Sequence, residues 1–181
     1  LFEMAGIPYV GCGVLASATC MDKETTHRLV EAAGISMAPF VALTRGQLAD
    51  VERLEPMLAE KLNYPMFVKP ANTGSSVGVS KVKTPDQLRE ALEKAFAYDR
   101  KVLVEKAIIG AEVECAVLGN YENAIASVVG EIAPKHEFYD YEGKYLDDST
   151  DLYIPARISD MAAQKVQQAA KKAFAAMGCT G

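Results

Sequence analysis

The chain has 181 residues, of which 50% are hydrophobic and 24% charged, and its formal net charge is −5. This length and apolar content are enough for one large or two small globular domains with a hydrophobic core. No run of Lys and Arg exceeds two residues, which argues against a nucleic-acid partner.

Helical periodicity and capping residues predict four helices. Residues 22–33 are expected to form the first, with Asp22 at its N-cap and Gly34 at its C-terminal end. Residues 48–62 are expected to form the second, which Pro56 bends or splits in two. The other two are predicted at residues 84–97 and 159–177.

Short apolar or alternating runs bounded by turn residues predict a series of strands. They lie at residues 40–43, 66–68, 77–82, 101–105, 112–118 and 124–129. The segment 133–153 then loses periodicity and is rich in Tyr, Asp, Glu and Lys, which is long for a structureless connection. Connections of this length are often functional, so the segment is a candidate functional loop.

The four cysteines are scattered without a CxxC pair, and only two histidines accompany them. This pattern predicts reduced thiols, with neither a zinc site nor a disulfide framework. No apolar run approaches the roughly 20 residues of a membrane span, and the first residues lack the order of a signal peptide. We therefore expect a cytoplasmic protein without a membrane partner.

A loop of small residues follows Lys69. Gly74 and Gly78 carry no Cβ, so backbone N–H groups there can approach phosphate oxygens closely, and the neighbouring serines add hydroxyl donors. Lys69 supplies a compact positive charge. The loop is not a P-loop, because no GxxxxGK[ST] string occurs and a strand follows it. Taken alone, the loop is more simply interpreted as an ordinary hairpin connection.

Three further segments accompany the loop in a fixed order: residues 6–11, 21–23 and 138–145. With the loop they resemble the D-alanine:D-alanine ligases of the ATP-grasp superfamily, over nearly the whole chain. The resemblance implies an α+β ATP-grasp fold, in which two α+β subdomains grip ATP between antiparallel sheets.

The same resemblance implies how the chain is divided. Residues 1–21 would be the end of the N-terminal domain and a linker, and residues 22–98 the small central subdomain. Residues 99–181 would be the first part of the C-terminal subdomain. The chain would then be a central fragment, without the N-terminal domain and the C-terminal metal-binding segment of the family.

The resemblance also assigns residues to the phosphates of ATP. Lys23 and Lys69 match the two lysines that hold the α- and β-phosphates, although Lys23 could equally be a solvated lysine at a helix start. Ser75, Ser76 and Gly78 match the loop that closes over the phosphates.

The nucleoside end of ATP is assigned to a predicted strand and the residues after it. Glu105 matches the carboxylate that faces the exocyclic amino group of adenine, and Lys106, Ala107 and Ile108 match the hinge whose backbone meets the ring. Glu112 matches the acceptor for the ribose hydroxyls, a role that needs two acceptor atoms on a rigid strand. The alternative for both glutamates is edge-strand charge that faces water.

Catalytic roles are implied for three residues. Lys144 would approach the γ-phosphate during transfer, where positive charge stabilises the equatorial oxygens. Tyr145 would hydrogen-bond to Ser75 and tie the long loop to the glycine loop.

Asp99 and Arg100, by contrast, are interpreted as surface turn residues.

The implied reaction is ATP-dependent ligation of two D-alanines through an acyl phosphate, for peptidoglycan precursor synthesis. Magnesium is expected to bind with ATP through ligands beyond residue 181, so no residue of this chain is assigned to a metal. The full-length protein is expected to be a homodimer, and the isolated 181 residues are expected to be inactive.

Two other ligases remain open: a D-alanine:D-lactate ligase that makes a depsipeptide, or another ATP-grasp carboxylate–amine ligase. A nucleotide-binding module without activity would lack the lysine at position 144, and a purely structural domain would not be stabilised by ATP.

Overall fold

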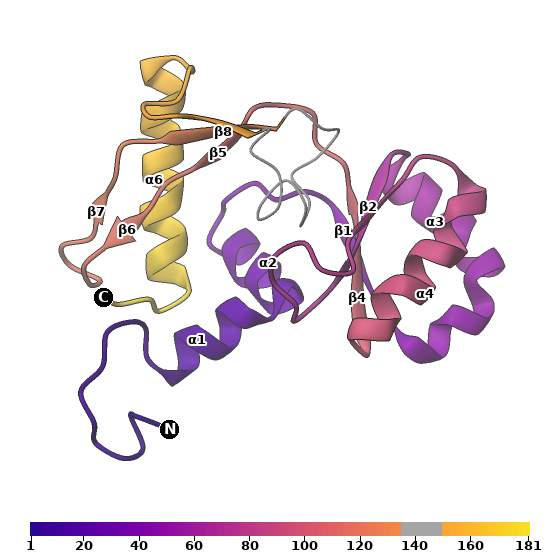
Figure 1. Cartoon of the computed structure of the whole chain (residues 1–181), viewed down its shortest axis with the longest axis horizontal. Helices are drawn as coiled ribbons and strands as arrows, with labels where there is room; N and C mark the ends of the chain where they lie inside the picture. Colours follow the sequence, from indigo (N-terminus) through magenta and orange to yellow (C-terminus); the bar gives the residue numbers. More distant parts are fainter. Residues whose placement is uncertain (135–149) are drawn as a thin grey trace. The chain divides into compact units, whose positions relative to one another are not determined.

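The computed structural model describes residues 1–134 and 150–181 and separates the chain into two compact units (Figure 1). Unit 1 contains Leu1–Ser36, residues 111–134 and residues 150–181. Unit 2 contains Met37–Gly110. The predicted division at residues 21/22 and 98/99 stays a prediction, and the compact units divide the chain elsewhere.

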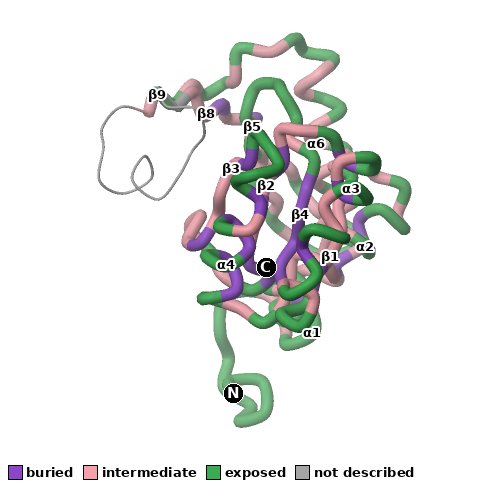
Figure 2. The backbone as a smooth tube through the Cα atoms, turned by 90° about the vertical axis from the view of Figure 1, so that its right-hand side faces the viewer, coloured by how far each residue is buried: buried purple, intermediate pink, exposed green. Residues whose placement is uncertain are grey.

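Unit 2 is built on a four-stranded antiparallel sheet with strand order β1-β4-β2-β3. The strands are β1 (Phe40–Thr44), β2 (Met66–Pro70), β3 (Ser80–Val82) and β4 (Lys101–Lys106). β4 pairs with β1 on one side and with β2 on the other, so it lies inside the sheet and its middle is buried (Figure 2).

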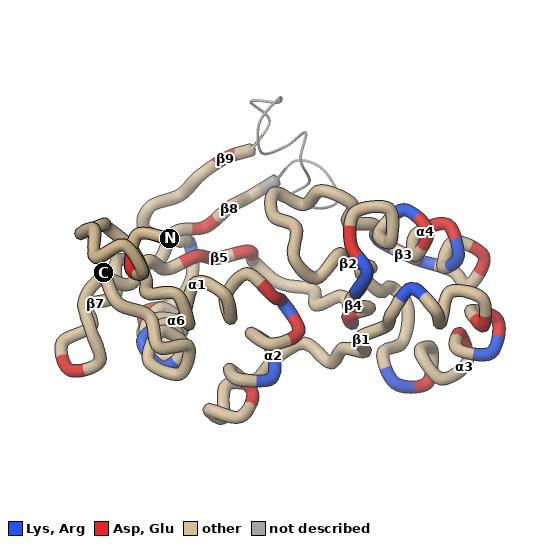
Figure 3. Tube along the Cα trace, turned by 90° about the horizontal axis from the view of Figure 1, so that it is seen from below, with Lys and Arg blue, Asp and Glu red and all other residues tan. Residues whose placement is uncertain are grey.

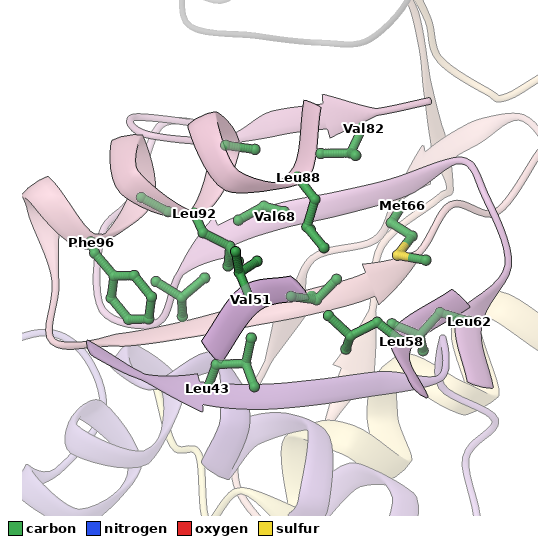
Figure 4. Close-up of a cluster of buried hydrophobic side chains, with 14 residues drawn as sticks. Leu43, Val51, Leu58, Leu62, Met66, Val68, Val82, Leu88, Leu92 and Phe96 are labelled. Carbon is green, nitrogen blue, oxygen red and sulfur yellow. The ribbon is translucent and has the colours of Figure 1, made fainter. Parts of the chain in front are cut away.

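Two amphipathic helices pack on this sheet: α3 (Val51–Leu62) and α4 (Leu88–Tyr98). Each follows a 3-10 turn, at Arg45–Asp50 and Pro85–Gln87 respectively. Their buried residues recur at helical spacing and form one core with alternate residues of the strands (Figure 4). Both acidic and basic residues lie along these two helices (Figure 3).

The position of this core determines which side chains of β2 point away from α3 and α4. Met66 and Val68 are fully buried in the core, whereas Phe67 and Lys69 are half-buried. Because successive side chains of a strand point to opposite faces, Phe67 and Lys69 lie on the face opposite α3 and α4. That face carries the candidate site.

Unit 1 combines three helices with two small antiparallel sheets in its described residues. The helices are α1 (Val14–Met21), α2 (Lys23–Ala32) and α6 (Asp160–Ala176). The sheets are β5-β8-β9, from Glu112–Glu114, Gly130–Pro134 and Thr150–Tyr153, and β6-β7, from Val117–Leu118 and Ile125–Ala126. α6 packs on β6, β7 and α2.

The α+β class and the antiparallel sheets are confirmed, and so are two predicted helix starts. Asp22 accepts a hydrogen bond from the N–H of Thr25 (3.0 Å), and Ser159 accepts one from that of Ala162 (3.2 Å). Both satisfy a backbone donor that the first turn of a helix cannot pair internally.

Several predicted boundaries were wrong. α3 continues through Pro56, and the break in the predicted helix instead lies where the 3-10 turn ends, at Asp50. The predicted strand 77–82 is reduced to β3, and the predicted strand 112–118 is divided between β5 and β6. The main elements that the sequence did not predict are α1, β8 and β9.

Among the described residues, no helix is long and apolar enough to cross a membrane.

Candidate functional site

A lysine and a carboxylate meet on the face of the unit 2 sheet opposite α3 and α4. The β2–β4 register pairs Lys69 with Leu103 and Phe67 with Glu105, so Lys69 and Glu105 are diagonal neighbours on one face. Lys69 Nζ lies 2.5 Å from Glu105 Oε2, and the two side chains are 27% and 6% exposed. A carboxylate this buried needs a cation or donors to offset its lost hydration, and Lys69 supplies the charge.

A second lysine lies on the same face. β3 pairs Lys81 with Phe67, and Lys81 Nζ is 5.9 Å from the centre of the Phe67 ring. Lys69 Nζ is 5.6 Å from the same centre, so two ammonium groups lie within 6 Å of one aromatic ring. Two cations, an aromatic ring and a carboxylate acceptor suit a ligand that combines anionic groups with a polar planar group.

The glycine loop between β2 and β3 is built from two tight turns. The N–H of Val77 donates to the carbonyl of Gly74 (3.1 Å), and that of Val79 donates to the carbonyl of Ser76 (3.2 Å). Ser75 and Ser76 have φ values of 54° and 58°, in the left-handed region. That region costs an L-residue about 1–2 kcal/mol, and residues held there concentrate at ligand-binding loops.

Both ends of the loop are anchored in unit 2. The N–H of Ala71 donates to the carbonyl of Lys101 (3.0 Å) at the start of the loop. At its end Gly78 is buried, with a φ of 73°, and a Cβ on it would lie 2.6 Å from the Tyr98 ring and 2.8 Å from Cγ of Pro70. The loop therefore leaves the sheet at a fixed position and returns through a place that only glycine fits.

Asp99 holds the start of the glycine loop, and its interpretation as a surface turn residue was incomplete. Oδ2 accepts hydrogen bonds from the backbone N–H (2.8 Å) and the side-chain amide (2.9 Å) of Asn72. Oδ1 accepts from the N–H groups of Arg100 (2.7 Å) and Lys101 (3.3 Å). The sequence indicates a turn at Asp99, but no local pattern identifies a partner 27 residues earlier.

These contacts predict a pH-dependent stability contribution from Asp99. Desolvation alone would raise its pKa, but the hydrogen bonds from Asn72, Lys101 and Arg100 outweigh it, so the pKa is lowered. A carboxyl whose pKa is lower in the folded chain stabilises fully above its unfolded pKa of about 3.9. The contribution is lost as the pH falls through the lower folded value.

We expect Asp99→Asn to destabilise the chain by about 1–2 kcal/mol at neutral pH, because an amide accepts these hydrogen bonds less strongly than a carboxylate. Urea unfolding of both proteins at pH 7, 5 and 3 measures the difference. It should be equal at pH 7 and 5 and shrink at pH 3. A difference that does not change with pH would show that the charge of Asp99 contributes nothing.

The residues assigned to the adenine hinge follow β4 directly. The N–H of Lys106 donates to the carbonyl of Pro39 (2.9 Å), and that of Ala107 donates to the carbonyl of Pro65 (3.1 Å). These two amides are therefore engaged within unit 2. A ligand at this strand end would be met by their carbonyl oxygens and by Ile108, whose side chain is exposed.

Lys23 and Glu112 belong to unit 1. Lys23 is the first residue of α2, directly after the N-cap, and it is half-buried. Glu112 is the first residue of β5 and is exposed. That they bind the same ligand as the Lys69 face stays a prediction.

A buried glutamate in unit 1 is held by one arginine. Glu131 accepts hydrogen bonds from the backbone N–H (2.9 Å), Nε (3.1 Å) and Nη2 (2.8 Å) of Arg157, whose guanidinium lies 3.5 Å from the ring centre of Tyr153. The hydrogen bonds from Arg157 lower the pKa of Glu131. This cluster ties β8 and β9 to the approach to α6, which is a structural role.

Lys144 and Tyr145 lie outside the described residues, so their assigned roles stay predictions. Within residues 1–134 and 150–181 no group of three or more His, Cys, Asp or Glu side chains is arranged to hold a metal ion. The expected magnesium ligands beyond residue 181 are likewise untested.

Comparisons with known proteins all point to one family. Residues 29–181 match the family model described as D-ala D-ala ligase C-terminus. The whole chain is 52% identical to the D-alanine–D-alanine ligase of Acetivibrio thermocellus and 53% identical to D-alanine–D-alanine ligase A of Chromobacterium violaceum. It covers 48% and 49% of those proteins, so it spans about half the length of the curated relatives it matches.

Solved structures agree with this result. The VanG D-Ala:D-Ser ligase from Enterococcus faecalis superposes with a TM-score of 0.87 at 44% identity, over 99% of this chain and 51% of that protein. The D-alanine-D-alanine ligase from Coxiella burnetii superposes with a TM-score of 0.81 at 32% identity, over 99% of this chain and 46% of that protein. The chain therefore belongs to the D-alanine–D-alanine ligase family and represents its C-terminal, ATP-grasp region.

Proposed function

We propose that the protein carrying this chain joins two D-alanines to D-alanyl-D-alanine, with ATP as the energy source and an acyl phosphate as intermediate. The observation that carries this proposal is an identity of about half over the whole chain to enzymes of that name. The product would serve peptidoglycan precursor synthesis, and we place the enzyme in the cytoplasm as a homodimer.

The geometry of unit 2 supports the nucleotide side of this proposal. Lys69 would hold phosphate oxygens, and Glu105 would accept from the adenine amino group, because a lysine and a buried carboxylate in contact offer both polarities on one face. We add Lys81 to the proposed binding residues, since it flanks Phe67 on that face. Ser75 and Ser76 would donate to phosphate from the strained turn.

The remaining roles rest on the family. Lys23 would contact the phosphates and Glu112 the ribose. Lys144 would stabilise the transferring phosphoryl group, and Tyr145 would tie the long loop to Ser75. Magnesium, which compensates the phosphate charge in such reactions, would be held by the ligands that the family resemblance places beyond residue 181.

Similar proteins differ in their second substrate, since one similar structure is that of a D-Ala:D-Ser ligase. D-Alanine is the acceptor in the names of the relatives that are about half identical. We therefore propose D-alanine, with D-serine and D-lactate as the competing acceptors.

A competition experiment tests this assignment. The longest natural protein that contains this chain is incubated with ATP, magnesium and equal concentrations of D-alanine, D-serine and D-lactate, and the products are identified by mass spectrometry. We expect D-alanyl-D-alanine to exceed each mixed product by at least about tenfold, the discrimination that about 1.4 kcal/mol provides. A predominance of D-alanyl-D-serine or D-alanyl-D-lactate would reassign the acceptor, and no ADP formation would overturn the ligase proposal.

We also propose that the 181 residues alone bind nucleotide weakly and do not catalyse ligation, since they span about half of the curated relatives. Phosphate release from ATP and D-alanine by this chain alone would contradict that.

A further inference from the structure

Three of the four cysteines come together in unit 1. Cys20, near the end of α1, and Cys179, just after α6, are 159 residues apart in sequence, yet their Sγ atoms are 3.8 Å apart. Cys12 lies close to the same place: burial raises the pKa of the Cys179 thiol to about 12, with further contributions from Cys20 and Cys12. All three are free thiols in the structure.

The backbone on both sides of this pair is held in place. Thr26 Oγ1 donates to the carbonyl of Thr19 (2.9 Å), which fixes the end of α1 against α2. After α6, Gly178 turns the chain with a φ of 69°, and the N–H of Cys179 donates to the carbonyl of Phe174 (3.0 Å).

The last residues of the described chain are also anchored. Gly181 exchanges two backbone hydrogen bonds with Gly119 (2.7 and 2.9 Å). A Cβ on Gly181 would lie 3.5 Å from Gly11, the residue before Cys12. The approach of the thiols is therefore a property of how three segments pack, and not of a free chain end.

We propose that Cys20 and Cys179 form an oxidisable dithiol, a modification site at which a peroxide or a small-molecule disulfide reversibly creates an intramolecular disulfide. A disulfide bond is about 2.05 Å long, so the 3.8 Å between the two Sγ atoms must close by roughly 1.8 Å. Rotation of the two cysteine side chains about their Cα–Cβ bonds is the movement that would bring the sulfurs together.

The chemistry assigns a different role to each thiol. Cys20 is exposed and would meet the oxidant first: its thiolate attacks a peroxide oxygen, giving a sulfenic acid and hydroxide. Cys179, half-buried and with a raised pKa, would then attack the Cys20 sulfur, and its proton leaves with the displaced hydroxide as water. In total the two thiols lose two protons and two electrons, and hydrogen peroxide is reduced to two waters.

The disulfide would also constrain the proposed nucleotide site, and this consequence rests on the proposed function. Cys20 lies three residues before Lys23, in the last turn of α1, which Asp22 alone separates from α2. Tying the end of α1 to the segment after α6 would restrict the position from which Lys23 reaches phosphate. We expect the oxidised chain to bind ATP at least threefold more weakly than the reduced chain.

Disulfide mapping tests the proposal independently of nucleotide binding. The reduced full chain is treated with hydrogen peroxide, unreacted thiols are alkylated, and the peptides are identified by mass spectrometry. We expect a Cys20–Cys179 linked peptide, lighter by two hydrogens than its parts and at least tenfold more abundant than any other cysteine pair, which disappears on reduction with dithiothreitol. Oxidation without this link, or mainly to a Cys12 link or to an intermolecular link, would overturn the proposal.

Single serine variants provide the controls. Cys20→Ser and Cys179→Ser should each abolish the linked peptide. Cys115→Ser is the matched control and should leave it unchanged, because the Cys115 thiol donates to the carbonyl of Ser127 (3.5 Å) in another part of unit 1. If the link forms but ATP affinity is the same in the oxidised and reduced chains, the coupling to Lys23 is wrong while the dithiol stands.

Discussion

Replacing Gly78 by alanine is expected to destabilise the chain by about 2–4 kcal/mol, the largest effect of any single substitution in the glycine loop. Its φ of 73° is costly for any residue with a Cβ, and that atom would lie 2.6 Å from the Tyr98 ring and 2.8 Å from Pro70. Pro70 belongs to β2, inside the sheet, and cannot move aside cheaply. Urea unfolding monitored by circular dichroism measures the loss.

The same loop offers a matched control. A Cβ added at Gly74 would meet no atom within 4 Å, and the φ of Gly74 lies outside the left-handed region. Gly74→Ala should therefore change stability by less than about 0.5 kcal/mol. Removing the ring in a Gly78→Ala, Tyr98→Ala double variant should recover part of the loss, because one of the two clashes disappears. Equal stabilities of the two alanine variants would contradict the packing argument.

Local signals predicted much of the fold. The helix starts at Asp22 and Ser159 were predicted because a capping side chain bonds to a backbone N–H only three residues away. The short apolar run of β2 and the helical spacing in α4 are equally local, and both lie where the structure has buried residues. Interactions of this kind are readable because both partners lie in one short stretch of sequence.

Elements without a local signal were missed. α1 has no side-chain cap at Gly13, no acidic residue in its first turn and Ala16 as its buried residue, so it lacks the polar and apolar alternation of a surface helix. In the glycine loop, Val77 and Val79 favour a strand by propensity. They instead belong to two turns, because the serines before them adopt positive φ.

The candidate site was only partly predictable for a similar reason. Lys69 and the glycine loop are contiguous, so their residue types alone indicated phosphate binding. The contact of Lys69 with Glu105 depends on the β2–β4 register, and that of Asp99 with Asn72 on the packing of a loop against a helix end. Lys81 joins the face only through its pairing with Phe67. No short pattern specifies pairings between distant segments.

Replacing Lys69 by methionine is expected to impair stability and nucleotide binding together. The Glu105 carboxylate is 6% exposed and would lose the cation at 2.5 Å, which should cost about 2–3 kcal/mol for a pair whose lysine is still partly solvated. ATP affinity should fall at least tenfold, because the proposed phosphate contact disappears. Urea unfolding and isothermal titration calorimetry measure the two effects on one preparation.

A second substitution separates the two effects. In Lys69→Met, Glu105→Gln the buried charge is removed with its partner, so much of the lost stability should return, since a neutral amide is far less costly to bury than an unpaired carboxylate. ATP binding should not return, because neither the cation nor the adenine acceptor is restored. Lys81→Met is the comparison variant: it removes a lysine whose Nζ lies 5.9 Å from the same ring centre and leaves the Lys69–Glu105 ion pair in place, so it should weaken ATP binding less than Lys69→Met. If the double variant regained full ATP affinity, Lys69 and Glu105 would be a structural ion pair, and the nucleotide face would have to be sought elsewhere.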